Sequence, residues 1–263
     1  MMTPSRPAWT ESRQRRGIVV LAALVVLVGL WHVFVAFIYG GAIPLPTLPS
    51  TVGAFLEMVR DGELQAAAWE SFQVLLLGTI PGVVIGIALG LAIGAFRPLD
   101  TMLSPYVFAF YSTPFPALIP IFILILGFGL VGKGTIVFTL VVTTVLLQTI
   151  AGVKSVDPRF IEAARAFGSS RARMLFEVQL PAALAFIVAG IRLAIGRALV
   201  GVVVAEIDTA LSGLGALIFG YSGRLDLSKA LVPALLFAGT GIVLAVALRS
   251  AERRFERWRQ VGA

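Results

Sequence analysis

Three ionisable side chains fall in or beside one long apolar stretch of the sequence, and they are the first candidates for chemistry. Arg192 and Arg197 lie within residues 181–205, and Glu206 follows directly. If this stretch crosses a membrane as a helix, Arg192 lies about 16 Å from its start. A charge at such depth costs roughly 2.5–3.5 kcal/mol on insertion scales. Three interpretations of the two arginines stay open: attraction of an anion along a translocation path, pairing with carbonyls or with an acid on another helix, and snorkelling toward the headgroups.

The rest of the sequence offers little that could catalyse a reaction. It contains no cysteine and one histidine, His32, so thiolate metal sites and His-cluster metal chemistry are excluded. No catalytic pair of acids, no nucleophile with a base and no metal cluster converges anywhere in the sequence. Residues 127–135 nearly match a phosphate-binding P-loop, but Gly134 stands where that loop needs a hydroxyl, and no soluble strand precedes it. We therefore expect that the chain is not an enzyme and holds no cofactor or metal of its own.

The elements that position these residues must be membrane spans. The chain of 263 residues is 58% hydrophobic and 13% charged, with a mean hydropathy of +0.96. A soluble domain carries roughly a quarter charged residues, so this composition excludes that class. A bilayer core needs about 20 apolar residues per helix. Six segments meet this length: 18–38, 72–96, 106–128, 135–153, 181–205 and 230–248.

The distribution of positive charge predicts the orientation. With six spans both termini lie on one side, and fifteen of the 21 Lys and Arg residues fall in the segments on that side, against four on the other. The positive-inside rule places the fifteen in the cytoplasm. Loops of this kind account for the sequence pI of about 10.5, so no nucleic-acid partner is needed to explain it. The tails 1–17 and 249–263 and the loop 154–180 are then cytoplasmic, and Glu206 with Asp208 indicates an outer gate or a receptor-docking element.

The sequence of the loop 154–180 predicts a compact helical projection. Asp157 can cap a helix that begins at Pro158, and Gly168 can end it by taking a positive φ. Phe160, Ala164 and Phe167 then share one apolar face. A surface of this kind favours docking to a soluble partner. The alternative is an amphipathic helix that lies on the inner membrane surface.

At this loop the chain resembles a known family, the inner-membrane permease subunits of binding-protein-dependent ABC importers. Their signature is EAA, three residues, Gly, nine residues and Ile-x-Leu-Pro. The residues that match it, with Val in place of Ile, are Glu162, Ala163, Ala164, Gly168, Val178, Leu180 and Pro181. The resemblance implies that residues 160–167 form a coupling helix that docks on a separate ATPase subunit. The ATPase-coupling residues it implies are Phe160, Glu162, Ala163, Ala164, Phe167 and Gly168.

The resemblance covers most of the chain and narrows to the nitrate, taurine and aliphatic-sulfonate group. It is carried by short motifs that include GIRLAIG at 190–196, AE at 205–206 and SGLG at 212–215. The same group includes importers of neutral heterocyclic vitamin precursors. It therefore implies a small solute of one of these kinds, delivered by a solute-binding protein.

The third predicted span carries three prolines, at positions 114, 116 and 120. Each removes a backbone donor, so we expect this helix to be bent or broken near its middle. Irregular backbone at membrane depth is tolerated where protein or a water-filled cavity satisfies it. Tyr111, Ser112, Thr113 and Phe115 are therefore candidates for lining the path, together with Arg192, Arg197 and Glu206. The alternative is an ordinary proline kink filled by packing.

Two further patterns concern packing. Glycines recur every four residues at 78, 82, 86, 90 and 94, a small-residue stripe that lets helices approach closely, within the subunit or at a dimer seam. Residues 48–70 suggest a short amphipathic helix on the outer surface, capped by Ser50.

These observations predict an all-α membrane protein with six transmembrane helices and the type I, MetI-like permease fold, its membrane domain being residues 18–248. We expect a multi-pass protein of the bacterial cytoplasmic membrane, with both termini cytoplasmic. The expected partners are two ABC ATPase subunits that bind ATP and Mg, a solute-binding protein, and a second, identical permease copy. The alternative is a six-span secondary transporter or channel that works without an ATPase; an intramembrane enzyme lacks converging catalytic groups.

Overall fold

The computed structural model describes residues 8–39, 41, 44–209 and 211–260, and within them every regular element is helical. The first seven residues of the predicted tail 1–17 and the last three of 249–263 lie outside the described residues. The elements, in chain order, are α1 (Ala8–Val33), η1 (Phe34–Ile38), α2 (Leu48–Arg60), α3 (Glu63–Ala95), α4 (Arg97–Ser112), η2 (Phe115–Leu118), α5 (Ile119–Leu126), α6 (Leu130–Lys154), α7 (Pro158–Ala166), α8 (Arg171–Met174), η3 (Leu175–Gln179), α9 (Leu180–Thr209), α10 (Leu214–Gly223) and α11 (Leu227–Gln260).

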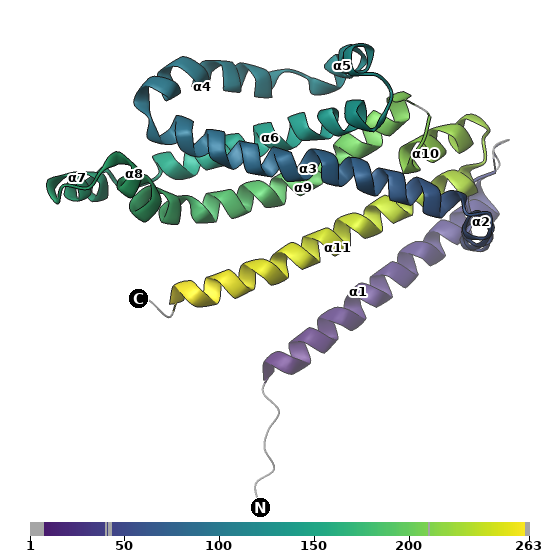
Figure 1. Cartoon of the computed structure of the whole chain (residues 1–263). Coiled ribbons are helices and arrows are strands. Elements are labelled where there is room, and N and C mark those ends of the chain that lie inside the picture. Colours follow the sequence, from purple (N-terminus) through teal and green to yellow (C-terminus); the bar gives the residue numbers. More distant parts are fainter. Residues whose placement is uncertain (1–7, 40, 42–43, 210, 261–263) are drawn as a thin grey trace, which may run out of the picture.

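Helices α3, α6 and α9 form the core of the molecule and lie side by side (Figure 1). The glycine stripe of α3 faces α6: a Cβ added at Gly86 would lie 2.9 Å from the Cβ of Val145, and one at Gly82 would lie 2.7 Å from Cγ1 of Val141. The β-branched residues Val137, Val141, Val145, Thr149 and Val153 of α6 fill the stripe at the same four-residue interval. The stripe therefore packs within the subunit, which decides between the two sites left open by the sequence.

Four helical runs are long and apolar enough to cross a membrane: Glu63–Ala95, Leu130–Lys154, Arg171–Thr209 and Leu227–Ser250. The bent pair α4–α5 raises the number to five among the described residues. The chain is therefore an all-α, multi-pass membrane protein, and five of the predicted segments coincide with these elements. The predicted first span, 18–38, falls on α1 and η1, which lie apart from the core (Figure 1), so the count of six stays a prediction.

The predicted break in the third span is confirmed. Helix α4 ends at Ser112, residues 113–114 leave the helix, and the axes of Arg97–Ser112 and Phe115–Leu126 meet at 90°. Pro114 and Pro116 lack the N–H groups that a continuous helix would need here. The helix also begins nine residues before the predicted start at Tyr106, because Pro98 stands in its first turn and Pro105 is tolerated inside it.

The core has two ends that differ in what they carry. Helices α7 and α8 project beyond one end, here called the α7 end, whereas α2 and α10 cover the opposite, α10 end (Figure 1). At the α10 end, the short helix predicted within residues 48–70 is α2, which ends at Arg60, but its predicted cap is wrong. Thr47 is the N-cap and Ser50 completes a capping box, with Ser50 Oγ accepting from the Thr47 N–H at 2.9 Å, since Leu48 and Pro49 occupy the first helical positions.

Candidate functional site

The projecting loop folds as its sequence predicts. The Asp157 carboxylate caps α7 by accepting the N–H of Arg159 at 2.9 Å, and Pro158 occupies the first turn. Gly168 has φ +74°, and the backbone N–H groups of Gly168 and Ser169 close the helix end on the carbonyls of Arg165 and Ala164. The Ser170 hydroxyl then caps α8. The chain therefore reverses sharply between two short helices.

Helix α7 buries none of its residues in this chain. Phe160 is 66% exposed and Phe167 90%, whereas Ile161 and Ala164 are half-buried on the side toward the protein. Glu162 and Ala163 are exposed between the two phenylalanines. Exposed aromatic side chains beside small residues are typical of a surface that another protein covers.

A cavity of about 680 Å³ lies between α4, α6 and α9. Its lining is mostly apolar, and its polar side chains are few: Tyr111, Thr144, Gln148, Lys154 and Arg197. Gln148 reaches it because Gly190 of α9 leaves room: a Cβ at position 190 would lie 2.8 Å from that of Gln148. An apolar cleft with a few polar groups is the usual form of a small-solute site.

The Arg197 guanidinium is held by an aromatic side chain. Its Nη2 donates to the Tyr111 hydroxyl at 2.8 Å, and its Cζ lies 4.7 Å from the centre of the Tyr111 ring. Within the described part of the chain no acid forms an ion pair with Arg197. The positive charge is therefore stacked and hydrogen-bonded, but a carboxylate does not neutralise it.

A second, smaller cavity of about 230 Å³ adjoins the break between α4 and α5. Thr113, Phe115 and Pro116 line it from the break, Thr139, Leu140 and Thr143 from α6, and Tyr111 and Arg197 again contribute. The structure thus brings Tyr111, Thr113, Phe115 and Arg197 together. The Ser112 hydroxyl is exposed and donates to the Phe108 carbonyl of its own helix.

The other two predicted path residues lie elsewhere. Arg192 is exposed and does not line either cavity. It precedes Arg197 by five residues, which is about 140° around the helix axis. Glu206 is fully buried near the α10 end of α9, where Ser71 Oγ lies 2.7 and 2.9 Å from its two carboxyl oxygens and the Gly215 N–H donates to it at 2.8 Å.

Glu206 belongs to a buried polar network that fixes the segment before α10. Beside it, the 1% exposed Lys133 donates to Glu70 Oε1, to the Ser212 carbonyl and to the Ser212 hydroxyl, each at 2.9 Å. Gly213, with φ +96°, lies against the Glu206 carboxyl, where a side chain would collide. Because all three donors of Lys133 are engaged, the P-loop-like stretch has no lysine to offer a phosphate.

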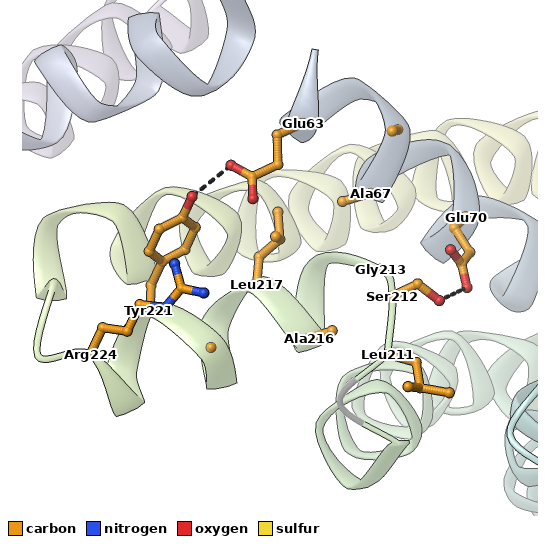
Figure 2. A pocket seen from close by; sticks show the side chains of 12 residues that line it. Glu63, Ala67, Glu70, Leu211, Ser212, Gly213, Ala216, Leu217, Tyr221 and Arg224 are labelled. Carbon is orange, nitrogen blue, oxygen red and sulfur yellow. Dashed lines mark hydrogen bonds between the residues drawn. The ribbon is translucent and has the colours of Figure 1, made fainter. Parts of the chain in front are cut away.

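A hollow of about 360 Å³ opens at the α10 end between α3 and α10 (Figure 2). Glu63 and Glu70 lie along its α3 wall, and Tyr221 and Arg224 come from the end of α10 and the residue that follows it. The Tyr221 hydroxyl donates to Glu63 Oε2 at 2.7 Å, and this bond raises the pKa of Tyr221. Among the described residues neither Glu63 nor Arg224 has an ion-pair partner.

Sequence reasoning missed the polar residues that α6 contributes. Thr139, Thr143, Thr144 and Gln148 read as scattered polar positions in an apolar span, yet all four line a cavity. Successive separations of four, one and four residues place them within one half of the helix circumference, and this pattern could have shown it. The contacts of Glu70, Ser71 and Lys133 could not be predicted from the sequence, because they join residues 63 to 143 positions apart.

The bent span, the lined cavities and the projecting loop between two spans define a helical membrane permease. Residues 82–260 match the family described as "Binding-protein-dependent transport system inner membrane component", and the chain belongs to this family. SsuC of Bacillus subtilis, named as an aliphatic sulfonates transport permease protein, is 30% identical over 234 residues, which cover 89% of this chain and 85% of SsuC. TauC of Escherichia coli K12, a taurine transport system permease protein, is 27% identical over 258 residues, 96% of this chain and 94% of TauC.

A solved structure supports the fold. A chain from the inward-facing MetNI methionine ABC transporter superimposes with a TM-score of 0.57 at 20% identity, covering 76% of this chain and 97% of its own. The predicted family and the MetI-like permease fold are thereby confirmed. The chain is a membrane permease subunit of an ABC importer, so the alternative of a transporter or channel that works alone is set aside.

Proposed function

We propose that this permease translocates a small solute, delivered by a solute-binding protein, through a passage driven by a separate ATPase pair. Two copies of this chain form the passage, and ATP and Mg bind to the partner ATPase subunits. The solute is a sulfonate-, taurine- or nitrate-like anion or a heterocyclic vitamin precursor. The names of SsuC and TauC support the first of these classes, and the mostly apolar cavity beside a cationic Arg197 accommodates either.

The observation that carries this proposal is the shape of the α7 surface. Phe167 is 90% exposed at the C-terminal cap of α7, and none of the residues of this helix is buried. Leaving a large aromatic side chain in water is unfavourable, so a partner should cover it. The surface is therefore the coupling helix, with Phe160, Glu162, Ala163, Ala164, Phe167 and Gly168 as its contact and turn residues.

The two ends of the molecule then face opposite compartments. The α7 end carries Arg159, Arg165, Arg171 and Arg173, which favours the cytoplasm under the positive-inside rule. Both termini share that side, and the α10 end faces outward. The binding protein docks there, and the hollow with Glu63 and Arg224 offers it two charges that lack ion-pair partners among the described residues.

The passage runs along α6 through the two cavities. Tyr111, Thr113, Phe115 and Arg197 line it, and Ser112 lies beside it. Glu206 serves the outer end by holding α10, and Arg192 lies outside the passage. When the ATPase pair closes, the displaced α7 moves the core helices and opens the passage outward; hydrolysis returns it inward.

The test is binding of the ATPase subunits to the purified permease. Phe167→Ala should weaken their affinity by about tenfold or more, because buried aromatic anchors dominate interface energies. Ala163→Glu, which places a second charge on the exposed part of α7, should abolish stimulation of ATP hydrolysis by the binding protein. Phe55→Ala, an exposed phenylalanine at the α10 end, is the matched control and should leave the affinity unchanged. Unaltered binding in both α7 variants would exclude this surface as the coupling helix.

A further inference from the structure

The two cavities follow one another along the same side of α6. The smaller one is lined by Thr139, Leu140 and Thr143, and the larger one begins at Thr144 and reaches Lys154 at the α7 end. From Thr139 to Lys154 the helix rises about 22 Å, most of the thickness of a bilayer core. Among the residues that the structure describes, Tyr111 and Arg197 are the two that line both cavities. The pair therefore stands where the cavities meet.

The two members of the pair are held very differently. Arg197 lies on the core helix α9, between Ala194 and Ala198, which are both fully buried against the neighbouring spans. Tyr111 is 43% exposed in the last turn of α4, directly before the break at residues 113–114. The backbone that carries Arg197 is thus anchored in the core, whereas Tyr111 lies at the end of a helix whose continuation turns away by 90°.

We propose that the Tyr111–Arg197 pair is the gate between the two cavities, an inference that rests on the proposed passage along α6. In the closed arrangement seen here, one hydrogen bond of 2.8 Å and one ring contact of 4.7 Å join the wall of α4 to that of α9. The gate opens when the end of α4 carries Tyr111 away. The guanidinium offers donors and no acceptor, so a solute takes the place of the phenol by presenting an acceptor.

An ion pair connects this gate to the coupling loop. Lys154, the last residue of α6, donates to Asp100 Oδ1 at 2.6 Å, and Asp100 lies in the first turn of α4. Three residues after Lys154, Asp157 caps α7. Asp100 and Tyr111 are about 16 Å apart along α4, one near each end. A displacement of α7 therefore moves the first turn of α4 through the Lys154–Asp100 ion pair, and α4 transmits this movement to Tyr111.

The absence of cysteine from the natural sequence allows a direct test. Ala151→Cys places a thiol in the larger cavity, and Thr139→Cys places one beyond the pair in the smaller cavity. A negatively charged, membrane-impermeant methanethiosulfonate reagent is applied from the α7 side of vesicles that contain the permease alone. We expect rapid labelling of Ala151→Cys and slow labelling of Thr139→Cys. Adding Tyr111→Phe, which keeps the ring and removes the hydroxyl, should accelerate the second rate about tenfold and leave the first unchanged.

The control is Tyr106→Phe, which removes a hydroxyl from a 75% exposed tyrosine of the same helix and should alter neither rate. The unchanged labelling of Ala151→Cys reports that each variant is folded. If Thr139→Cys is labelled as fast as Ala151→Cys with the pair intact, or if Tyr111→Phe has no effect on it, the pair is not a gate. Neither outcome involves the ATPase or the binding protein, so a failure here is distinct from a failure of the coupling proposal.

Discussion

At the scale of single residues, Lys133 shows how a buried charge can stabilise a permease away from its passage. Its ammonium joins α6 to α3 through Glu70 and to the segment before α10 through Ser212. Lys133→Met would keep the bulk of the side chain but remove the charge that pairs with Glu70, which keeps its hydrogen bond from the Ser212 hydroxyl, and leave the Ser212 carbonyl without its donor. Since breaking a buried ion pair costs roughly 3–5 kcal/mol and Glu70 is 30% exposed, we expect a loss of about 3 kcal/mol in unfolding free energy.

Thermal unfolding of the purified protein in detergent measures this loss. Lys229→Met is the control, because its ion pair with Glu57 at 2.7 Å is more exposed, with relative side-chain exposures of 22% and 54%. Surface pairs contribute about 0–1 kcal/mol, so its midpoint should change little. Equal midpoints for both variants would show that the network around Lys133 does not hold the α10 end together.

Residues whose role depends on local geometry could be predicted from the sequence. Asp157, Pro158 and Gly168 act on neighbours within a few positions, and each lies in the structure as predicted. The roles of Arg197 and Glu206 could not be separated in that way, because both are ionisable groups on one apolar helix. Their partners, Tyr111 and Ser71, come from α4 and α3, far away in the chain. Only the packing of those helices shows that Arg197 lines a cavity and that Glu206 is buried in a polar network.

At the scale of helices, the α3–α6 contact depends on the glycine stripe. Gly86→Val would place a side chain 2.9 Å from the Cβ of Val145 and 3.0 Å from the carbonyl oxygen of Val142. Overpacking of this kind typically costs 1–3 kcal/mol, so the unfolding midpoint should fall by several degrees. Gly53→Val on α2 is the matched control, since a Cβ there meets nothing within 4 Å. If both variants unfold at the same temperature, the stripe does not set the distance between these helices.

The ion pair between α4 and α6 permits a prediction of a different kind. Asp100→Asn removes the charge that holds the first turn of α4 to Lys154. Because the two side chains are 26% and 45% exposed, stability should change by less than about 1 kcal/mol. In the assembled importer, however, the change that ATP binding causes in the labelling rate of Thr139→Cys should be reduced severalfold. Glu57→Gln, which weakens the exposed pair at the α10 end, should leave that change intact; an equal response in both variants would exclude the Asp100–Lys154 link.

Apolar length and the positions of proline sufficed to predict α3, α6, α9, α11 and the break between α4 and α5. The direction in which a helix bends, and the helices that pack against it, could not be predicted from these features. Nearly every position of these helices is apolar, so periodicity does not distinguish a face that meets lipid from one that meets another helix. The stripe was recognised from Gly78 to Gly94, but its partner became clear only from the matching Val and Thr residues of α6.

At the scale of the whole molecule, the proposed orientation can be measured with two single cysteines. Arg165→Cys marks the α7 end and Arg60→Cys the α10 end, and both arginines are exposed. In intact cells an impermeant thiol reagent should label Arg60→Cys and spare Arg165→Cys, because the positive-inside rule assigns α7 to the cytoplasm. After permeabilisation both should be labelled. The opposite pattern in intact cells would invert the topology and remove α7 from the reach of a cytoplasmic ATPase.

In the same proposed orientation, the hollow at the α10 end faces the side from which we propose that the binding protein docks. Glu63→Gln keeps the acceptor for the Tyr221 hydroxyl but removes a charge that has no ion-pair partner within the described residues. Charges of this kind guide docking, so the concentration of binding protein that gives half-maximal stimulation of ATP hydrolysis should rise about two- to tenfold. The maximal rate should not change, because the network of Lys133 and Glu206 still holds α10 in place.

Two controls accompany this prediction. The increase in half-maximal concentration should become smaller with added salt, whereas Glu57→Gln, outside the hollow, should cause no increase. A lower maximal rate at unchanged half-maximal concentration would assign Glu63 to the opening of the passage instead of to docking.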